Sequence, residues 1–376
     1  MVQAVTFTPS LSNPRPLGME GHISGLNYDF VMPGGCNSAS LLLQLPPGYR
    51  SDALNPGRII RMYKGTSVVW DGKLAEPVST KDGWQVTAVG LGVLGTDFAA
   101  MWGGEGYSLN SPIDNAVTRG LRWGNASPGI TAGWLSGGAD RTTWPDNASF
   151  TVTDHMTNIT AKQGMTWYVS RPQGNSLTGK LNTFQLPTYV NRLLVSSDPV
   201  PRSVFGELTT LWVSFMYSDD NNGNQVTQLT RVSLDGTVQE PVGVLTINDI
   251  AAHGPNELYI DITGAGVLPQ AQAQQMALNL LAKYGRSAWG GPFSFHYGNW
   301  LTLGGSPIDI ATDQAGSVAR VLVSDAPFGG EVLFGALEFV VGKYSYDDDS
   351  QIATATPYQS YLTDLQTLLS SSIAWA

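Results

Sequence analysis

The stretch YKGTSVVWDGKLAEPVSTKDGWQVTAVGL, residues 63–91, predicts a small antiparallel sheet. A Lys-Gly pair at 64–65 and an Asp-Gly pair at 71–72 are tight-turn signals, and Lys-Asp-Gly at 81–83 marks a further hairpin. From residue 84 onward, inward and outward positions alternate with a period of two, as in a half-buried strand. The stretch holds no pattern that indicates catalysis.

Segments on the N-terminal side of this stretch extend the sheet. The sequence GCNSASLLLQLPPGY, which begins at Gly35, predicts another apolar strand. An Asn-Pro-Gly loop at 55–57 leads into the strand that precedes the opening stretch. We therefore expect residues 1–100 to form a first small antiparallel β-barrel domain.

Composition favours a mainly β fold with several domains. The chain has 376 residues, which exceeds what one core usually holds, and 43 Gly and 22 Pro indicate frequent turns. Charged residues make up only 13%, so the surface is expected to be largely neutral. The single cysteine, Cys36, excludes an intrachain disulfide framework, and stability must come from packing.

The net charge indicates which kinds of partner the protein can bind. A formal net charge of -10 gives the molecule as a whole no electrostatic grip on phosphate backbones, although DNA could slide through an acidic or neutral pore. No run of eighteen apolar residues and no signal-peptide pattern occurs, so we expect no membrane segment.

The middle of the chain predicts two α+β domains. In residues 101–205, helix signals occur at 111–121 and 153–163, and the strand MTWYVS follows at 165–170. In residues 206–300, a hairpin turns at the sequence SDDNNGN, and an amphipathic helix is expected over 269–284.

The last part returns to strands. Strands at 318–324 and 332–346, an Asp-Asp-Asp-Ser reversal and QIATATPY predict a second β-barrel domain over residues 301–376, with a C-terminal helix from Pro357. The segment VVWDGKLAEPV at 68–78 is similar to EVLFGALEFVV at 331–341, which suggests an internal duplication. The residues that carry this barrel signature are Trp70, Gly72, Leu74, Trp84, Gly335, Leu337 and Glu338.

Motifs for catalysis or metal binding are weak. No nucleophile elbow, P-loop or dinucleotide fingerprint occurs, and Cys36 is interpreted as structural. The acidic run at 347–349 is interpreted as a solvated hairpin tip. The histidines stand singly, without zinc spacing, at His22, His155, His253 and His296. We expect no cofactor, metal site or enzymatic activity, while a pair of glycosidase carboxylates distant in sequence stays open.

Eleven tryptophans raise the question of carbohydrate binding. Those at Trp70, Trp84, Trp167 and Trp212 lie in predicted strands and are interpreted as core. Three in a Gly-rich region are candidate glycan contacts by stacking: Trp123, Trp134 and Trp144.

The order of these elements resembles the baseplate hub, or tail-associated, proteins at the tail tip of tailed bacteriophages. The resemblance lies in Gly35-Cys36 with its apolar strand, the loop at 55–57, VVWDGKL at 68–74, DGWQVTAVGL at 82–91 and the late strands from LFGALEFVV onward. It covers nearly the whole chain, and no single motif is diagnostic.

This resemblance implies a homotrimer in which two barrel domains per subunit form a six-membered ring. Such a hub joins the sixfold tail tube to a threefold tip, and genomic DNA leaves through it without specific binding. The implied partners are the distal tail protein, the tail tube or tape measure protein, and tail fibre or other tip proteins. The implied location is the distal end of the phage tail in the virion.

Other interpretations remain open. The chain could be the distal tail ring protein itself, which also has a barrel, or a tail adhesin that binds host glycans through the loop tryptophans. A glycosidase is the least favoured interpretation.

Overall fold

The computed structural model describes most of the first 92 residues, much of the last 85, and separate segments between them. The described residues are 2–46, 48–49, 51–92, 99–100, 104–107, 130–135, 142–144, 150–151, 153, 156–157, 160, 165–172, 179–185, 189–196, 210–218, 225–233, 238–239, 257–261, 270, 274, 292–323 and 338–358.

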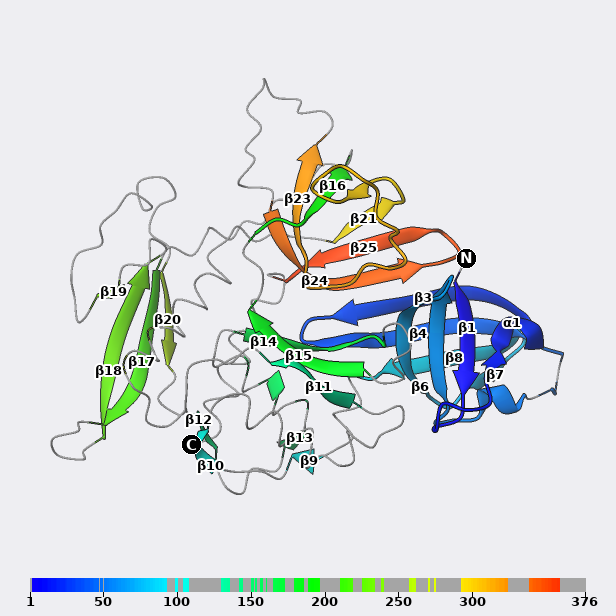
Figure 1. The fold of residues 1–376 in the computed structure, drawn as a ribbon, viewed down its shortest axis with the longest axis horizontal. Helices are drawn as coiled ribbons and strands as arrows, with labels where there is room; N and C mark the ends of the chain where they lie inside the picture. The colour runs from blue at the N-terminus through cyan, green and yellow to red at the C-terminus, as the bar shows by residue number, and fades with distance from the viewer. Residues whose placement is uncertain are drawn as a thin grey trace.

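The N-terminal strands form one antiparallel ladder, which we call the first sheet. Its order is β2–β1–β5–β6–β8–β4–β3, and β7 forms a hairpin with the first half of β8. Two helical turns, α1 and η1, lie in its connections (Figure 1). The bounds are β1 Gln3–Phe7, β2 Arg15–Pro16, α1 Leu17–Glu20, β3 His22–Val31, β4 Gly34–Gln44, η1 Asp52–Leu54, β5 Ile59–Lys64, β6 Ser67–Leu74, β7 Val78–Thr80 and β8 Gly83–Gly90.

The period of two predicted for the opening stretch is confirmed in β8. Val86 and Ala88 are buried, whereas Thr87 and Val89 are exposed. Because successive side chains of a strand point to opposite faces, one face of β8 packs on the core and the other meets solvent. The turns at 64–65 and 81–83 also form as predicted, between β5 and β6 and between β7 and β8.

The predicted turn at Asp71-Gly72 is wrong, because β6 runs without interruption through both residues. Asp71 is fully buried and pairs across the ladder with Arg61 of β5. Gly72 avoids a steric clash, because a Cβ at this position would lie 2.4 Å from the Trp70 ring and 2.4 Å from the Val89 oxygen. The Asp-Gly pair therefore serves a buried ion pair and a close approach of strands.

The C-terminal strands form a second run, which we call the second sheet. Its order is β22–β16–β23–β24–β25–β21, with β16 parallel to β23 and the other pairs antiparallel. Aromatic rings fill its interior, with Phe295 stacked on Trp300 and Phe293 stacked on Phe339, each at 4.8 Å between centroids. The bounds are β16 Arg192–Ser196, β21 Phe293–His296, β22 Trp300–Leu301, β23 Val318–Val323, β24 Glu338–Asp347 and β25 Ile352–Pro357.

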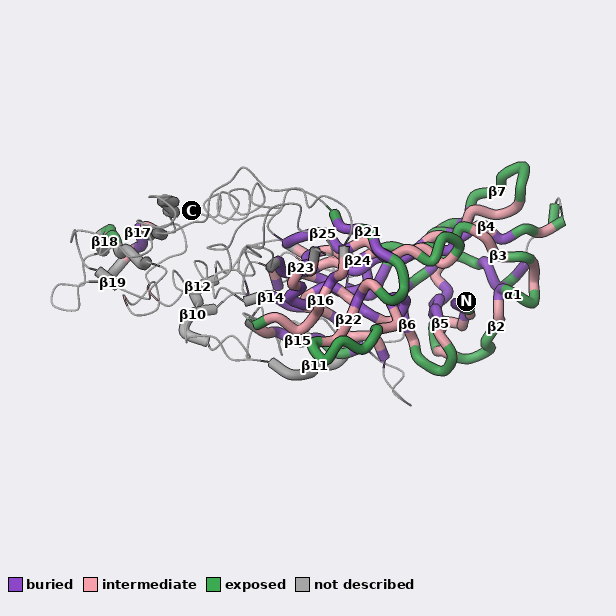
Figure 2. The backbone as a smooth tube through the Cα atoms, turned by 90° about the horizontal axis from the view of Figure 1, so that it is seen from above, coloured by how far each residue is buried: buried purple, intermediate pink, exposed green. Residues whose placement is uncertain are grey.

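The two sheets are joined directly, because β24 also pairs with β3. Lys343 lies opposite Val31, and the antiparallel register continues to Asp347 opposite Asn27. Figure 1 shows β24 lying against β3, with the N-terminus beside the β24–β25 hairpin. Figure 2 shows buried and intermediate residues around β24 and exposed residues at β7.

Further strands lie between these sheets in the sequence. β14 (Met165–Ser170) pairs with β15 (Gly179–Gln185), β15 with β11 (Ile130–Leu135), and β14 also reaches β4 at Gly35. A separate sheet has the order β19–β18–β17–β20, with β17 Thr210–Ser218, β18 Gln225–Ser233, β19 Val238–Gln239 and β20 Glu257–Asp261. Two small ladders pair β10 (Gly104–Tyr107) with β12 (Thr142–Trp144) and β9 (Ala99–Ala100) with β13 (Phe150–Thr151).

The mainly β prediction is confirmed, but closed barrels are not seen among the described strands. In the second sheet, β21 and β22 follow each other through a tight turn without a ladder between them. That sheet also includes β16 and β21, which the sequence places in the middle domains. The predicted hairpin of β17 and β18 and the strand β14 are confirmed.

The helix predictions are only partly visible. Residues 153, 156, 157 and 160 are helical, and so are 270 and 274. The predicted helices at 111–121 and after Pro357 lie outside the described residues, as does most of 331–341, so the duplication and the four domain borders stay predictions.

Candidate functional site

A short loop between β22 and β23, residues 309–313, is bound by side chains from several distant elements. We call it the central loop. Its own side chains shape it first: Asp309 Oδ1 accepts from the Ala311 amide at 3.1 Å, and the Asp309 carbonyl accepts from Thr312 Oγ1 at 2.8 Å. Two buried tyrosines then hold it, because Tyr28 Oη donates to the Ala311 carbonyl and Tyr344 Oη to the Ile310 carbonyl.

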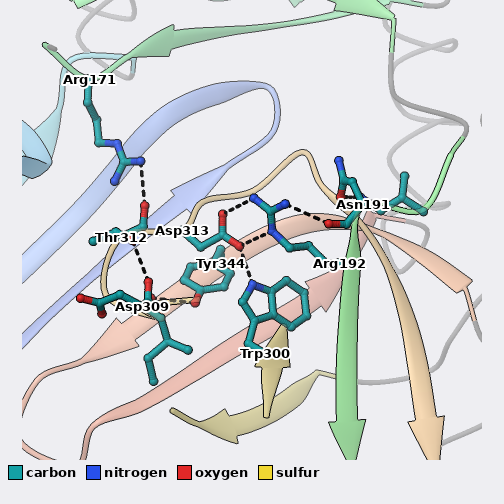
Figure 3. Close-up of polar contacts among 10 residues, drawn as sticks. Arg171, Asn191, Arg192, Trp300, Asp309, Thr312, Asp313 and Tyr344 are labelled. Atoms are coloured by element: carbon teal, nitrogen blue, oxygen red, sulfur yellow. Dashed lines mark hydrogen bonds and ion pairs between the residues drawn. The ribbon is translucent and has the colours of Figure 1, made fainter. Parts of the chain in front are cut away.

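Arg171, just after β14, connects the central loop to the first sheet. Its Nη2 donates to the Thr312 carbonyl at 2.9 Å, and its Nη1 donates to the Val69 carbonyl of β6 at 3.0 Å. The guanidinium also lies 5.1 Å from the centre of the Phe30 ring in β3, a cation–π distance. One half-buried side chain thus bridges three segments, and Figure 3 shows its contact with Thr312 of the central loop.

Asp313 attaches the central loop to the second sheet. Arg192 of β16 binds its carboxylate in a fork, with Nε at 2.8 Å from Oδ2 and Nη2 at 3.0 Å from Oδ1. The indole N–H of buried Trp300 donates to the same Oδ2. Asn191, next to Arg192, accepts from the Val318 amide at 3.0 Å, so β16 is fastened at its start (Figure 3).

The electrostatics of this cluster favour a structural joint over a reactive centre. Burial raises the pKa of Tyr28 and of Tyr344, which keeps both hydroxyls protonated as donors. The hydrogen bonds that Arg192 donates to the Asp313 carboxylate raise the pKa of Arg192, which keeps the guanidinium charged. Each group therefore has a fixed partner at neutral pH, and the cluster can hold β3, β14, β16 and β24 in place.

A second polar cluster lies where β3, β4 and β24 meet. The Asp29 carboxylate accepts from the Ser38 amide at 2.7 Å and from Asn37 Nδ2 at 3.1 Å, and it is 2.8 Å from Lys343 Nζ. The Asp29 carbonyl accepts from Trp70 Nε1 at 3.2 Å. These contacts tie the β3–β24 seam to the core of the first sheet.

The acidic hairpin tip at 347–349 is confirmed as a turn, and its carboxylates hold the N-terminal strands. Asp348 accepts from the Val2 amide at 3.1 and 3.2 Å, and Asp349 accepts from the Gly25 amide at 2.6 Å. Asp347 binds the amides of Asp349 and Ser350 within the turn. These carboxylates thus act as anchors for β1 and β3.

The barrel-signature residues of the first sheet are packing residues. Trp70 and Leu74 are buried, Gly72 makes room for the Trp70 ring, and half-buried Trp84 donates its indole N–H to the Tyr49 carbonyl at 2.8 Å. The core assignment also holds for Trp167, which is fully buried, while Trp212 is half-buried. Their part in ring formation stays a prediction.

The other predicted site residues either lie outside the described residues or are described by their backbone alone. Gly335, Leu337 and Trp123 lie outside the described residues. Glu338 pairs with Arg320 in the β23–β24 ladder, and the backbones of Trp134 and Trp144 lie in β11 and β12. Glycan contact by these tryptophans stays a prediction.

Cys36 packs inside the first sheet, and burial raises the pKa of its thiol to about 12. His22 and His296 are exposed, at the start of β3 and the end of β21, and the other two histidines lie outside the described residues. No group of three metal-ligating side chains occurs in the described part of the chain. Within the same residues, no helix is long and apolar enough to cross a membrane.

Large apolar side chains exposed at two places are candidates for contact with other proteins. Met19, Tyr49 and Val78 are exposed by 86%, 50% and 61% in α1, in the loop after β4 and in β7 of the first sheet. Tyr189, before β16, and Leu303, after β22, are exposed by 69% and 59% beside the second sheet. Sequence patterns do not reveal them, because exposure depends on the finished packing.

No family model matches the chain, and no curated protein matches it by sequence. Solved structures do match its fold. The 43 kDa tail protein of prophage MuSo2 from Shewanella oneidensis has a TM-score of 0.56 at 11% identity, over 96% of this chain and 99% of that one. A tail protein from Neisseria meningitidis MC58 has a TM-score of 0.54 at 12% identity, over 94% of each chain.

A third match is prophage tail protein gp18 from Listeria monocytogenes EGD-e. Its TM-score is 0.55 at 7% identity, over 99% of both chains. At such identities the likeness concerns the fold, and it extends over nearly the full length of each protein. The chain therefore has the fold of prophage tail proteins.

Proposed function

We propose that this chain is a structural component of a bacteriophage tail, located at the distal end of the virion. The observation that carries the proposal is the match of its fold, from end to end, to three tail proteins, two of them from prophages. The order of strands and turns in the sequence points to the same class of protein. The packed polar clusters, in which each charged group has a partner, suit a structural role better than catalysis.

Within the tail, we propose that the chain is a trimeric hub between the sixfold tail tube or distal tail ring and the threefold tip. A subunit that presents two sheet units in fixed relation could supply two of the six positions of a ring. The β3–β24 ladder and the central loop support this, because they hold the first and second sheets together. Strand pairing and buried polar contacts resist rotation of one unit against the other.

The proposed partners are the distal tail protein, the tail tube or tape measure protein, and tail fibre or other tip proteins. Genomic DNA would pass through the ring without specific binding, which agrees with a net charge of -10. The exposed side chains of Met19, Tyr49 and Val78 are suited to contacts with such neighbours.

Electron microscopy of the purified protein, with its mass measured by light scattering, tests the hub. We expect threefold particles with a central opening and a mass of three chains. A variant with Val78→Asp and Met19→Asp should lower the trimer fraction if the end of the first sheet is a subunit contact. Lys81→Ala in the exposed β7–β8 turn is the matched control. A monomer in solution together with no ring in the assembled tail tip would refute the trimeric hub.

A further inference from the structure

Two arginines lie at the edge of the first sheet where β1 ends. Phe7 of β1 pairs with Ile59, so the next step along the ladder places Thr8 beside Arg58. On the other side of β1, Arg15 pairs with Thr6. Figure 1 shows the chain leaving the arrowhead of β1 as a loop at this edge. The cluster stands out in a chain with a net charge of -10.

Arg58 is the buried member of this cluster. Its side chain is only 8% exposed, and Nη2 donates to the carbonyls of Asn13 at 3.0 Å and Thr6 at 3.5 Å. Its Nε is buried and has no hydrogen-bond partner. Among the described residues, no carboxylate lies within ion-pairing distance of Arg58. Asp52 is the acidic residue whose charge raises the pKa of Arg58, and it is exposed.

Such an arrangement is electrostatically unfavourable without an anion. A buried guanidinium loses hydration, and a second guanidinium nearby adds repulsion. Both effects lower the pKa of Arg58, burial first and Arg15 second, and Asp52 opposes them. A negatively charged group between the two arginines would remove both penalties.

The loop after β1 supplies neutral hydrogen-bonding groups at the same place. The hydroxyls of Ser10 and Ser12 are exposed and lie within 3.0 Å of each other and of the Thr8 hydroxyl, which itself donates to the Ser12 carbonyl at 3.0 Å. The loop is held closed by bonds from the Leu11 amide to the Thr8 carbonyl at 2.8 Å and from the Thr8 amide to the Ser12 carbonyl at 2.9 Å. Hydroxyls and guanidinium groups are the donors that protein sites use for phosphate oxygens.

We propose that this edge of the first sheet binds a phosphate group, with Arg15 and Arg58 as charged donors and the hydroxyls of Ser10 and Ser12 as neutral donors. Because the rest of the protein is acidic, the attraction is confined to this place and suits one or two phosphate groups rather than a long polyanion lying across the surface. This site goes beyond the tail role proposed above and does not depend on it.

The test is a titration of the full chain with inorganic phosphate, followed by the line width of the phosphorus NMR signal at constant ionic strength. The wild type should show saturable broadening. Removing Arg58 endangers folding, since it also holds two backbone carbonyls, so the decisive variant is Arg15→Ala, whose side chain is exposed. We expect about tenfold weaker binding in Arg15→Ala. Lys81→Ala, in the exposed turn between β7 and β8, should bind as the wild type does.

Absence of saturation in the wild type would overturn the proposal, and so would equal affinity in the wild type and Arg15→Ala. The source of the phosphate is then distinguished by competition. If glycerol phosphate or a short oligonucleotide displaces inorganic phosphate from the wild type but not from Arg15→Ala, the site accepts phosphate esters. If neither ester competes, the site is specific for the free ion.

Discussion

Arg61 lies directly opposite Asp71 in the β5–β6 ladder, with Nε 3.3 Å from Oδ2, and both side chains are removed from solvent. A buried ion pair of this kind is costly to desolvate, and the second carboxylate oxygen of Asp71 has no hydrogen-bond partner. Burial accordingly raises the pKa of Asp71 from 3.8 to about 6, although Arg61 acts in the opposite direction.

This pair predicts a pH dependence of stability. Since the pKa of Asp71 is higher in the folded than in the unfolded chain, folding takes up a proton between these values. The contribution of Asp71 to stability is fully present below about pH 4 and is lost as the pH rises through about 6. Relative to Asp71→Asn, the wild type should lose on the order of 3 kcal/mol between these limits, measured by urea unfolding. Asp82→Asn, in an exposed turn, should follow the wild type, whereas parallel curves for wild type and Asp71→Asn would contradict the prediction.

The joint at Asp313 predicts a loss of stability in Asp313→Asn. The amide keeps one acceptor oxygen but no charge, so the fork to Arg192 and the bond from Trp300 cannot both persist. We expect a loss of about 3 kcal/mol in the free energy of unfolding, measured with guanidinium and tryptophan fluorescence. Trp300→Phe, which removes the indole donor and part of the ring stacked on Phe295, gives a comparison for the aromatic part of the joint. An unchanged transition in Asp313→Asn would show that the joint contributes little.

The acidic hairpin tip predicts local loosening at the N-terminus. Replacing Asp348 and Asp349 together by Ala removes the acceptors of the Val2 and Gly25 amides. Hydrogen exchange of residues 2–7 should become about tenfold faster, as expected for the loss of one charge-assisted hydrogen bond. Ser350→Ala, in the same turn, should leave exchange unchanged. Equal exchange in the double variant would mean that pairing with β2 and β5 is enough to hold β1.

Gly90 predicts a strong dependence on side-chain size. A Cβ at this position would lie 1.8 Å from the Cys36 oxygen and 2.2 Å from the Cys36 carbonyl carbon, both backbone atoms of β4. We expect Gly90→Ala to cost about 3 kcal/mol or more, because β4 and β8 would have to separate. Gly18→Ala meets no atom within 4 Å and should be close to neutral. Thermal unfolding of the two variants side by side measures the difference.

The strands of the first sheet could be predicted because their signals are local. The alternation in β8 and the turn at 81–83 depend on residues close together in the chain. The local signal is wrong at Asp71-Gly72. An Asp-Gly pair is typical of a tight turn, but here it lies within a strand, where Asp71 faces the buried Arg61. Only the position of Arg61 across the ladder distinguishes the two.

The central loop could not be predicted, because its contacts join residues far apart in sequence. Tyr28, Arg171 and Arg192 meet residues 309–313 only after the sheets have assembled. The sequence does contain one signal for buried polar contacts. Only 13% of the residues are charged, so a charged residue within an apolar strand, such as Arg61 or Asp71, is expected to have a buried partner. The place of β16 in the second sheet could not be predicted either, because its five residues carry no signal for pairing with strands formed by residues after 292.

The seam between β3 and β24 bears on how the protein is made. Gly25, at the start of this seam, is fastened by a residue 324 positions later in the chain. During synthesis, the hydrogen-bonding edge of β3 thus stays open until Glu338–Asp347 has left the ribosome, and long-range pairing of this kind is slow. An unpaired strand edge can recruit other chains, so a chain interrupted before β24 would be prone to aggregate. Completion of the first sheet therefore depends on synthesis having reached β24.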